Sequence, residues 1–277
     1  MIWENRFRDK LDAGLPTLGT RIHSSWATVV ELVGYTGMYD YIEFTAEYAP
    51  FDIFTFEHLG RAFNLYDLTG VIKVGQESRA FQTAKALNSG FMGVNFADVR
   101  NAADAAACVA MVRAETPSLG GTRGVEQARD AKHVLEVGSP AWVEHTRRTV
   151  VTLMIEKKEA VEDVEGILDT EGVDMIVFGA RDYALSCGHV GQIAHPAVLE
   201  AQAHVFEEAR KRRIPVRGEF DTLADAEKFI EKGMRHINIG LDLRILHNWW
   251  RDNGKRLQEI YSTLGVESRL EAVGGAR

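Results

Sequence analysis

The chain has 277 residues, of which 45% are hydrophobic and 26% charged, a balance that is normal for a soluble globular protein. Its net charge of −8 and its pI near 5.6 argue against nucleic acid or an anionic membrane as a partner. The sequence shows no apolar signal-peptide core and no stretch long enough to span a bilayer, so we expect a cytoplasmic protein. Cys108 and Cys187 form no CxxC motif or disulfide framework, which fits a reducing compartment.

Eight short apolar runs of the β type follow one another along the chain. They cover residues 17–22, 39–44, 70–74, 91–96, 150–156, 173–179, 214–220 and 236–241. Between most of them lie segments in which apolar residues recur every three or four positions, as in helices. We also expect a helix before the first run and a long helix, from about residue 243, after the last.

Strands that alternate with helices predict parallel crossovers and a sheet buried on both faces. Eight such units in about 250 residues match a (β/α)₈ barrel, so we predict an α/β TIM-barrel fold with the two extra terminal helices. The rival fold is a doubly wound open sheet, whose GxGxxG fingerprint is missing after the first strand. Because no Pro/Gly/Ser-rich linker divides the chain, we predict one domain over residues 1–265 and a frayed tail over 266–277.

Two carboxylates stand where this fold places its active site. Glu156 closes the fifth apolar run, and Asp182 follows the sixth in "VFGARDYALSCG". With no obvious Lys or Arg between them, two converging carboxylates would repel unless a divalent cation bridged them, and oxygen ligands suit Mg²⁺ or Mn²⁺. The alternative is that Glu156 caps the next helix while Asp182 lies in a polar loop.

These motifs, taken in order, resemble the HpcH/HpaI aldolase family, the class II 2-keto acid aldolases related to the citrate lyase β subunit. The resemblance covers nearly the whole chain and is carried by "YIEFTAEYAPFD", "GFMGVNFADVRNAADAAACVAMVR", "GGTRGV", "MIEKKEAVEDVEGILDTEGVDMIVFGARDYALSCGHVG" and "LADAEKFIEKGMRHINIGLDLRIL". It implies reversible aldol cleavage of a 4-hydroxy-2-oxo acid to a pyruvate-like enolate and an aldehyde. It also implies a divalent metal ion, Mg²⁺, Mn²⁺ or Co²⁺, held by Glu156 and Asp182.

The resemblance also implies a small-molecule 2-keto acid as the partner and a homo-oligomer, a hexamer built as a trimer of dimers that exchange their last helix. The segment "LRILHNWWRDNGKRLQEIYSTLG" supports the assembly, because its apolar stripe is broader than one barrel face needs and contains paired tryptophans.

The resemblance fails at residues that would handle protons. Where the family has Asp, Gly, Glu and His after the second strand, this sequence has Thr45, Ala, Glu47 and Tyr48, so the usual His is a phenol. An Arg at the end of the third strand is Lys73 here, for which a salt bridge to Glu47 is the alternative role. His23, after the first strand, is another candidate proton carrier. Tyr48, Lys73, His23 and Glu47 are therefore the candidate catalytic residues.

The predicted substrate contacts also depart from the family. Met154 stands in place of a Gln that would orient pyruvate, and Ala180 and Arg181 replace a Pro and an Ala ahead of the metal Asp. Arg21 and Arg181 are candidate clamps for the distal end of an anionic substrate. The full candidate set is Arg21, Arg123, Met154, Gly179, Ala180 and Arg181.

These departures leave three alternatives to a metal-dependent aldol cleavage open. The first is another reaction of the same metal-bound enolate, by a decarboxylase, hydratase or hydrolase. The second is a class I aldolase in which Lys73 forms a Schiff base. The third is a non-catalytic barrel that binds a keto acid or a partner protein.

Overall fold

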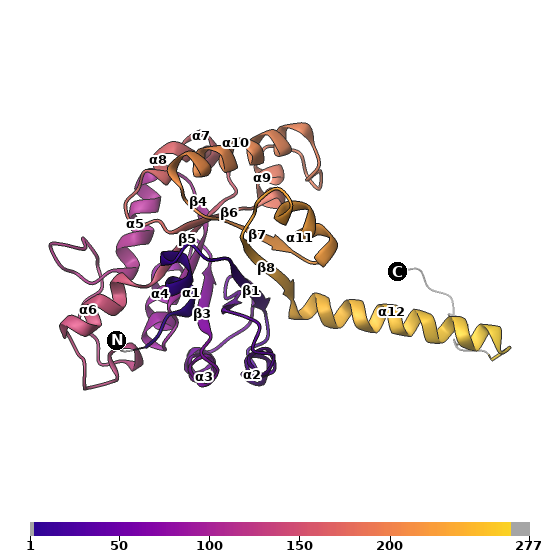
Figure 1. Ribbon diagram of the computed structural model, residues 1–277, viewed down its shortest axis with the longest axis horizontal. Helices are drawn as coiled ribbons and strands as arrows, with labels where there is room; N and C mark the ends of the chain where they lie inside the picture. The colour runs from indigo at the N-terminus through magenta and orange to yellow at the C-terminus, as the bar shows by residue number, and fades with distance from the viewer. Residues whose placement is uncertain (1–2, 267–277) are drawn as a thin grey trace.

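The computed structural model describes residues 3–266, and its eight parallel strands close into a barrel in chain order (Figure 1). The strands are β1 (Thr17–Ile22), β2 (Tyr41–Phe44), β3 (Thr69–Val74), β4 (Gly93–Val99), β5 (Val150–Ile155), β6 (Met175–Phe178), β7 (Val216–Phe220) and β8 (His236–Leu241). The predicted (β/α)₈ fold is confirmed. The bounds of β1 and β8 match the prediction, and those of the other strands differ from it by one to three residues.

Helices surround the barrel, and one helix precedes the first strand while another follows the last. They are α1 (Arg6–Asp12), α2 (Thr28–Tyr35), α3 (Ile53–Leu65), α4 (Arg79–Asn88), α5 (Ala102–Val112), α6 (Pro140–Arg147), α7 (Lys158–Glu162), α8 (Val164–Leu168), α9 (Ala180–Ser186), α10 (Pro196–Arg212), α11 (Leu223–Ile230) and α12 (Asp242–Thr263), with a 3₁₀ turn η1 (Arg129–Ala131). The predicted tail, 266–277, lies outside the described residues except for Val266.

The apolar core is a shell outside the barrel, because alternate strand residues point to opposite faces of the sheet. Outward-facing side chains such as Ile42, Phe44 and Phe96 are fully buried against the helices. The inward-facing positions include polar residues such as Glu43, Asn95 and Arg217, which are also buried. The same strands therefore carry the stabilising apolar contacts on one face and a polar interior on the other.

The pairing of β6 with β7 is the shortest link in the barrel. It covers Ile176↔Val216 and Val177↔Arg217, whereas four residue pairs join β5 to β6 and four join β7 to β8. Beyond Val177 and Arg217 the two strands no longer pair, so the wall of the barrel is interrupted there on the side of the carboxyl ends.

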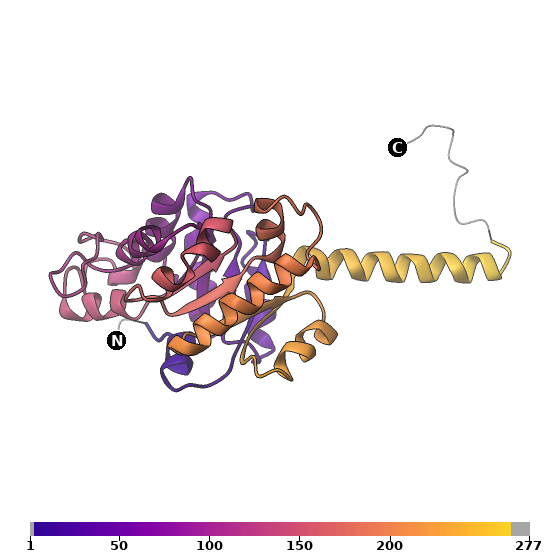
Figure 2. The same cartoon turned by 90° about the horizontal axis from the view of Figure 1, so that it is seen from above.

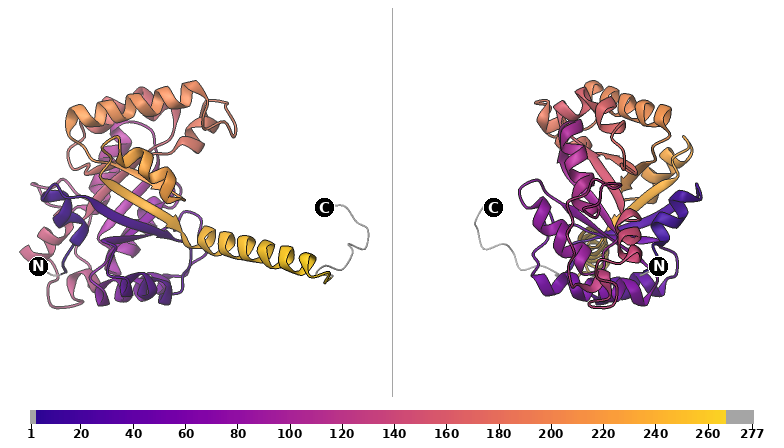
Figure 3. Two further views of the ribbon diagram at one scale, coloured as in Figure 1. Left: turned by 45° about the vertical axis from the view of Figure 1, so that its right-hand side comes forward. Right: turned by 90° about the vertical axis from the view of Figure 1, so that its left-hand side faces the viewer.

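Helix α12 projects away from the barrel (Figures 1 and 2, and the left view of Figure 3), and none of its 22 residues is buried. Its start is fixed by Asp242, whose carboxylate accepts hydrogen bonds from the backbone N–H groups of His23 at 2.9 Å and Ser24 at 2.8 Å. Neither α12 nor any other described helix combines the length and the apolarity that a membrane span requires.

Candidate active site

A cavity of about 560 Å³ opens at the carboxyl ends of the strands, where this fold places its catalytic groups. Its wall contains most of the predicted site residues: Arg21, His23, Thr45, Tyr48, Lys73, Met154, Glu156, Gly179, Ala180, Arg181 and Asp182. Two other candidates, Glu47 and Arg123, do not line it. The barrel thus gathers residues from β1, β2, β3, β5, β6 and the loops that follow these strands.

Glu156 lies at the end of β5 and is only 3% exposed. It does not cap the next helix. Instead, its Oε1 accepts a hydrogen bond of 2.8 Å from the backbone N–H of Asp98, which a bulge in β4 and a left-handed φ of 56° turn toward it. Burial raises the pKa of Glu156 to about 7, against the lowering effect of the Lys73 charge. A cation beside the carboxylate would offset this loss of solvation.

Gly179 leaves room for the Glu156 carboxylate. A β-carbon at this position would lie 2.5 Å from the Glu156 Oε2 atom, so any other residue would displace the carboxylate. Asp182, in the first turn of α9, has a side chain 45% exposed. Two carboxylates in the wall of one cavity match the oxygen ligands that Mg²⁺ and Mn²⁺ prefer.

The expectation that no cation separates the two acids was wrong, because Lys157 reaches into the site. Its Nζ lies 2.5 Å from Asp98 Oδ1 and 3.7 Å from Asp182 Oδ1. Lys157 directly follows Glu156 in the chain, so its position was visible in the sequence. The direction of its side chain depends on the bulge at Asp98 and was not.

Lys73 joins Glu47 to Tyr48. Its Nζ is 2.7 Å from Glu47 Oε2 and donates a hydrogen bond of 2.9 Å to the Tyr48 hydroxyl. Burial opposes the charge of Lys73, but the nearby carboxylates of Glu219 and Glu47 outweigh it and raise the pKa of the ammonium group. Burial also raises the pKa of Tyr48 to about 12, so the phenol keeps its proton at neutral pH.

His23 is held in one orientation by Thr45, because their Nδ1 and Oγ1 atoms are 2.6 Å apart. The Thr45 hydroxyl also lies 3.1 Å from the Ile22 carbonyl, to which it can donate its single proton. In that arrangement Nδ1 carries the proton of the imidazole and Nε2 keeps a lone pair. The ring stacks on Tyr48 with 5.9 Å between centroids. Burial lowers the pKa of His23, although Asp242 opposes this, and the imidazole is therefore neutral at pH 7.

Charged residues that the sequence analysis did not select fill the barrel interior. Arg217, 1% exposed, lies with its Nη2 atom 2.7 Å from a carboxylate oxygen of Glu43 and 2.7 Å from one of Glu219. Arg21, a predicted anion clamp, pairs with Glu219 at 2.9 Å and with Asp221 at 3.5 Å. The signal for this network was the alternation of charges in "VRGEF", which sets Arg217 and Glu219 on the same face of β7.

The structure does not bring Arg123 to the cavity. Its guanidinium pairs with Asp130 at 2.6 Å, donates to Asn88 at 3.0 Å and lies over the ring of Trp142. Arg123 therefore fastens the 120–125 segment to η1 and α6.

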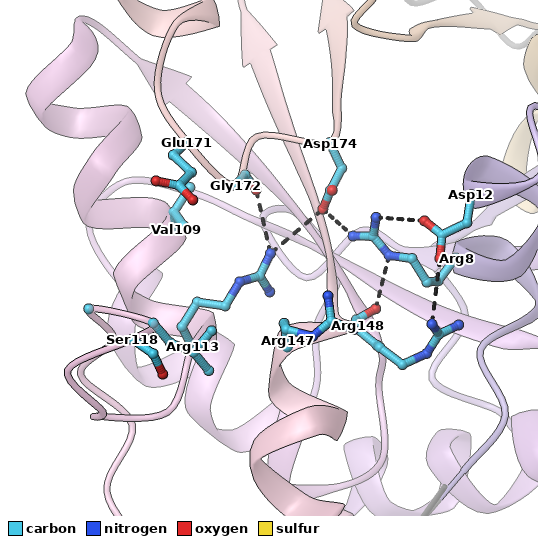
Figure 4. Close-up of a pocket in the computed structure, with 12 residues that line it drawn as sticks. Arg8, Asp12, Val109, Arg113, Ser118, Arg147, Arg148, Glu171, Gly172 and Asp174 are labelled. Atoms are coloured by element: carbon cyan, nitrogen blue, oxygen red, sulfur yellow. Dashed lines mark hydrogen bonds and ion pairs between the residues drawn. The ribbon is translucent and has the colours of Figure 1, made fainter.

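A second cavity, of about 490 Å³, contains four arginines and lies at the opposite end of the barrel (Figure 4). Asp174 accepts from Arg8 at 2.5 Å and lies 3.8 Å from Arg113, while Arg148 pairs with Asp12 at 3.5 Å. Since these arginines already have carboxylate partners, the cavity is a structural joint between α1 and the amino ends of β5 and β6.

Comparison with known proteins places the chain among enzymes of one family. The family model for HpcH/HpaI aldolase/citrate lyase matches residues 23–248. A 5-keto-4-deoxy-D-glucarate aldolase of Klebsiella pneumoniae is 28% identical over 248 residues, which are 89% of this chain and 94% of that protein. An HpcH/HpaI aldolase/citrate lyase family protein from Burkholderia cenocepacia has a TM-score of 0.82 at 27% identity and covers 93% of this chain and 99% of its own. The HpcH/HpaI aldolase of Desulfitobacterium hafniense, at 24% identity, also has a TM-score of 0.82, with coverage of 92% and 98%.

Proposed function

The chain belongs to the HpcH/HpaI aldolase/citrate lyase family and is an aldolase-type lyase, and from this premise we propose that it reversibly cleaves a 4-hydroxy-2-oxo acid to pyruvate and an aldehyde. One observation carries the proposal. Glu156, Asp182, Lys73, His23 and Tyr48 line a single cavity at the carboxyl ends of the strands. This set supplies metal ligands, a fixed cation, a neutral base and a proton donor.

The family generally depends on a divalent metal, and Glu156 and Asp182 are the residues that would hold it. When bound, Mg²⁺, Mn²⁺ or Co²⁺ would act as a Lewis acid toward the 2-oxo acid. The Asp98 N–H fixes the Oε1 atom of Glu156, and the Oε2 atom lies beside Gly179. The bond from Asp98 thereby sets the direction of one ligand atom before the metal arrives.

His23 acts as the base in this proposal. Its unprotonated Nε2 takes the proton of the substrate 4-hydroxyl as the carbon–carbon bond breaks, and returns it to the pyruvate fragment or to water. Thr45 keeps the tautomer that makes this possible. The Tyr48 hydroxyl accepts from Lys73 and is also hydrogen-bonded to the Glu47 carboxylate, so it would donate its proton to a substrate oxygen in exchange for the bond to Glu47.

Lys73 serves as a fixed positive charge and not as a Schiff-base nucleophile. An amine must lose its proton before it can attack a carbonyl, and the pairing of Lys73 with Glu47 at 2.7 Å favours the protonated form. The ammonium group instead stabilises negative charge that develops on the pyruvate fragment.

The proposal is tested with pyruvate alone, which needs no aldehyde. In D₂O with Mn²⁺ or Mg²⁺, we expect the methyl protons of pyruvate to exchange, as followed by NMR, and EDTA to stop the exchange. Replacement of His23 by Asn should slow it by about 10² to 10⁴ fold. Absence of exchange with every metal would refute the lyase mechanism.

Borohydride separates the two aldolase chemistries. With pyruvate present, we expect no reduced adduct on the protein and no loss of activity after treatment. A pyruvate adduct at Lys73 in the mass spectrum would replace the metal mechanism by the Schiff-base one.

We also propose that the enzyme is a homo-oligomer in which α12 packs on a second copy, with a hexamer, a trimer of dimers, as the expected state. The exposed apolar side chains of α12 support this, and they are Leu243, Ile245, Leu246, Trp249, Trp250, Leu257, Ile260 and Tyr261. Leaving them in water would lose the apolar burial that stabilises such a helix.

A further inference from the structure

We infer that the substrate of this enzyme carries an uncharged apolar chain beyond its 4-hydroxyl group, and that this chain leaves the barrel where β6 and β7 no longer pair and occupies a side cavity between α10 and α11. The inference rests on the proposed function, since it extends the same site. It assigns the aldehyde product to the aliphatic or aromatic aldehydes and excludes the sugar-acid semialdehydes.

The active-site cavity passes from the inside of the barrel to the outside. It is lined by inward-facing residues such as Lys73 and Met154, and also by Phe178 and Phe220, which belong to the outer core clusters. Because β6 and β7 pair over only two residues, the wall between these two sets of side chains is interrupted. At the interruption Gly218 has no room for a side chain, since a β-carbon there would lie 2.4 Å from the sulfur of Met234.

Another cavity, of about 670 Å³, adjoins the active-site cavity and lies between α10 and α11. The two cavities share Gln202, Phe206, Phe229 and Met234 in their walls, and three of these four side chains are apolar. An apolar chain placed against the shared side chains would leave water for a surface of similar polarity, whereas hydroxyl groups of a sugar acid would lose hydrogen bonds to water. The cavity between α10 and α11 is also lined by three exposed cations, Arg210, Lys232 and Arg235, so a dicarboxylate held there is a rival hypothesis.

The charges around the active-site cavity leave little attraction for a second substrate carboxylate. Five cations line it, Arg21, Lys73, Arg181, Arg217 and Arg244, and they face six carboxylates, Glu43, Glu47, Glu156, Asp182, Glu219 and Asp221. Four of the cations already pair with a carboxylate of the protein. Among residues 3–266, the exception is Arg181, which is exposed on α9 and has no ion-pair partner. The rival hypothesis is therefore a dicarboxylate held by Arg181.

The inferred substrate is R–CH(OH)–CH₂–CO–COO⁻, in which R is the apolar chain. The base removes the hydroxyl proton, the bond between C3 and C4 breaks, and C4 leaves as the aldehyde R–CHO. The electron pair of that bond stays with C3, which takes up one proton and becomes the methyl group of pyruvate. No oxidant, reductant or further reactant is needed.

The test measures binding and so does not depend on cleavage. Linear 2-oxo acids from 2-oxobutanoate to 2-oxodecanoate lack the 4-hydroxyl group, and their affinity for the Mg²⁺-loaded enzyme is measured by calorimetry. We expect roughly a three- to fourfold gain for each added methylene until the side cavity is full. We expect 2-oxohexanoate to bind about tenfold or more tightly than 2-oxoadipate, which has the same number of carbons and a second carboxylate.

A variant on α10 tests where the apolar chain of the ligand binds. Ala203 is exposed, lines only the outer of the two cavities and touches none of the proposed catalytic groups, so Ala203→Trp should fill that cavity. We expect the gain with chain length to disappear for the longer acids while 2-oxobutanoate binds as before. His204→Trp, one residue further on and outside both cavities, is the matched control and should behave as the unaltered enzyme.

Three results would overturn the inference. Affinity that does not change with chain length is one, and tighter binding of 2-oxoadipate, which would favour the Arg181 clamp, is another. The third is an Ala203→Trp variant that leaves the chain-length series unchanged but alters the oligomeric state in light scattering. That result would mean that a second copy of the chain covers the cavity, and not the substrate chain. If the series behaves as expected while pyruvate exchange is absent, the proposed lyase reaction fails and the binding inference remains.

Discussion

At the scale of single residues, the site is organised by carboxylates that hold cations in place. Glu47 fixes Lys73, and Glu219 fixes Arg21 and Arg217. Fixed charges of this kind need no reorganisation when negative charge develops on a substrate, which is how preorganised sites stabilise a transition state. The inferred preference for an uncharged substrate chain follows from the same pairing, because a cation already paired with Glu219 gains little by binding a second carboxylate.

The metal ligands give the first prediction. Glu156→Gln and Asp182→Asn should each weaken Mn²⁺ binding by more than about 100-fold and abolish pyruvate exchange, because each removes a charged oxygen ligand. Metal analysis and Mn²⁺ titration of the purified variants measure this. Glu159→Gln, which removes a surface carboxylate near Arg100, is the control and should bind Mn²⁺ normally. Normal metal content in both ligand variants would refute the assignment.

The sequence predicted those residues whose place follows from strand ends alone. Glu156 and Asp182 close or follow apolar runs, and the closed barrel brings their loops to one cavity. The interior pair Glu43 and Arg217 was missed because it joins β2 to β7, and the contact depends on the stagger of the strands around the barrel. Lys157 was missed because a bulge directs it. Local patterns determine the face of a side chain but not its partner.

At the scale of secondary-structure elements, the strands were easier to predict than the helices' contacts. The apolar runs predicted the first and last residues of β1 and β8 correctly. The pattern of α12, in contrast, predicted only an apolar stripe and not what the stripe contacts. The structure adds that no residue of α12 is buried among residues 3–266, while its first residue, Asp242, orients the His23 turn. The proposed subunit contact and the carboxyl end of β1 would therefore share one helix.

Helix α12 gives the second prediction. Trp249→Glu together with Trp250→Glu should dissociate the oligomer, because both side chains are more than 60% exposed in the single chain and need a partner surface. Multi-angle light scattering at micromolar concentration measures the mass. Arg251→Gln on the same helix is the control and should leave the mass unchanged. A monomeric unaltered protein would contradict the proposal.

Helix α6 gives a prediction about pH. Burial lowers the pKa of His145 to about 4, although Asp130 opposes this, whereas an unfolded imidazole titrates near 6.5. Below pH 6.5 the unfolded state therefore binds more protons than the folded state. The contribution of His145 to the free energy of unfolding is complete above that pH and decreases as the pH drops toward 4. The loss from this residue amounts to about 3 kcal/mol. Urea titrations at pH 7 and pH 5 should show a smaller loss for His145→Gln and an unchanged loss for the exposed His204→Gln.

At the scale of the whole molecule, the barrel separates two interiors. The apolar shell between strands and helices supplies the burial that stabilises the fold, while the inside of the barrel holds charges in pairs. The apolar runs and the helical segments between them made the first interior predictable from the sequence. The charged interior of the barrel was not predictable, because the role of a charge at an inward position depends on its partner on another strand.

The interior pair gives the last prediction. Arg217→Met should lower the free energy of unfolding by about 3–5 kcal/mol, because it leaves Glu43 buried without a counter-charge. The double variant Glu43→Gln, Arg217→Met should recover most of this loss, since a neutral pair needs no compensation. Urea unfolding measures both. A double variant as unstable as the single one would show that Arg217 acts through packing and not through charge.

The fully buried contact between Arg217 and Glu43 also has a consequence for inheritance. If the predicted stabilities hold, losing either residue alone costs more stability than losing both, so a lineage would pass from one state to the other only through a less stable intermediate. Arg217 and Glu43 should therefore appear and disappear together among descendants of a common ancestor. Such a pair would mark a lineage, and a chain that keeps it would retain the same charge-balanced cavity wall through long sequence divergence.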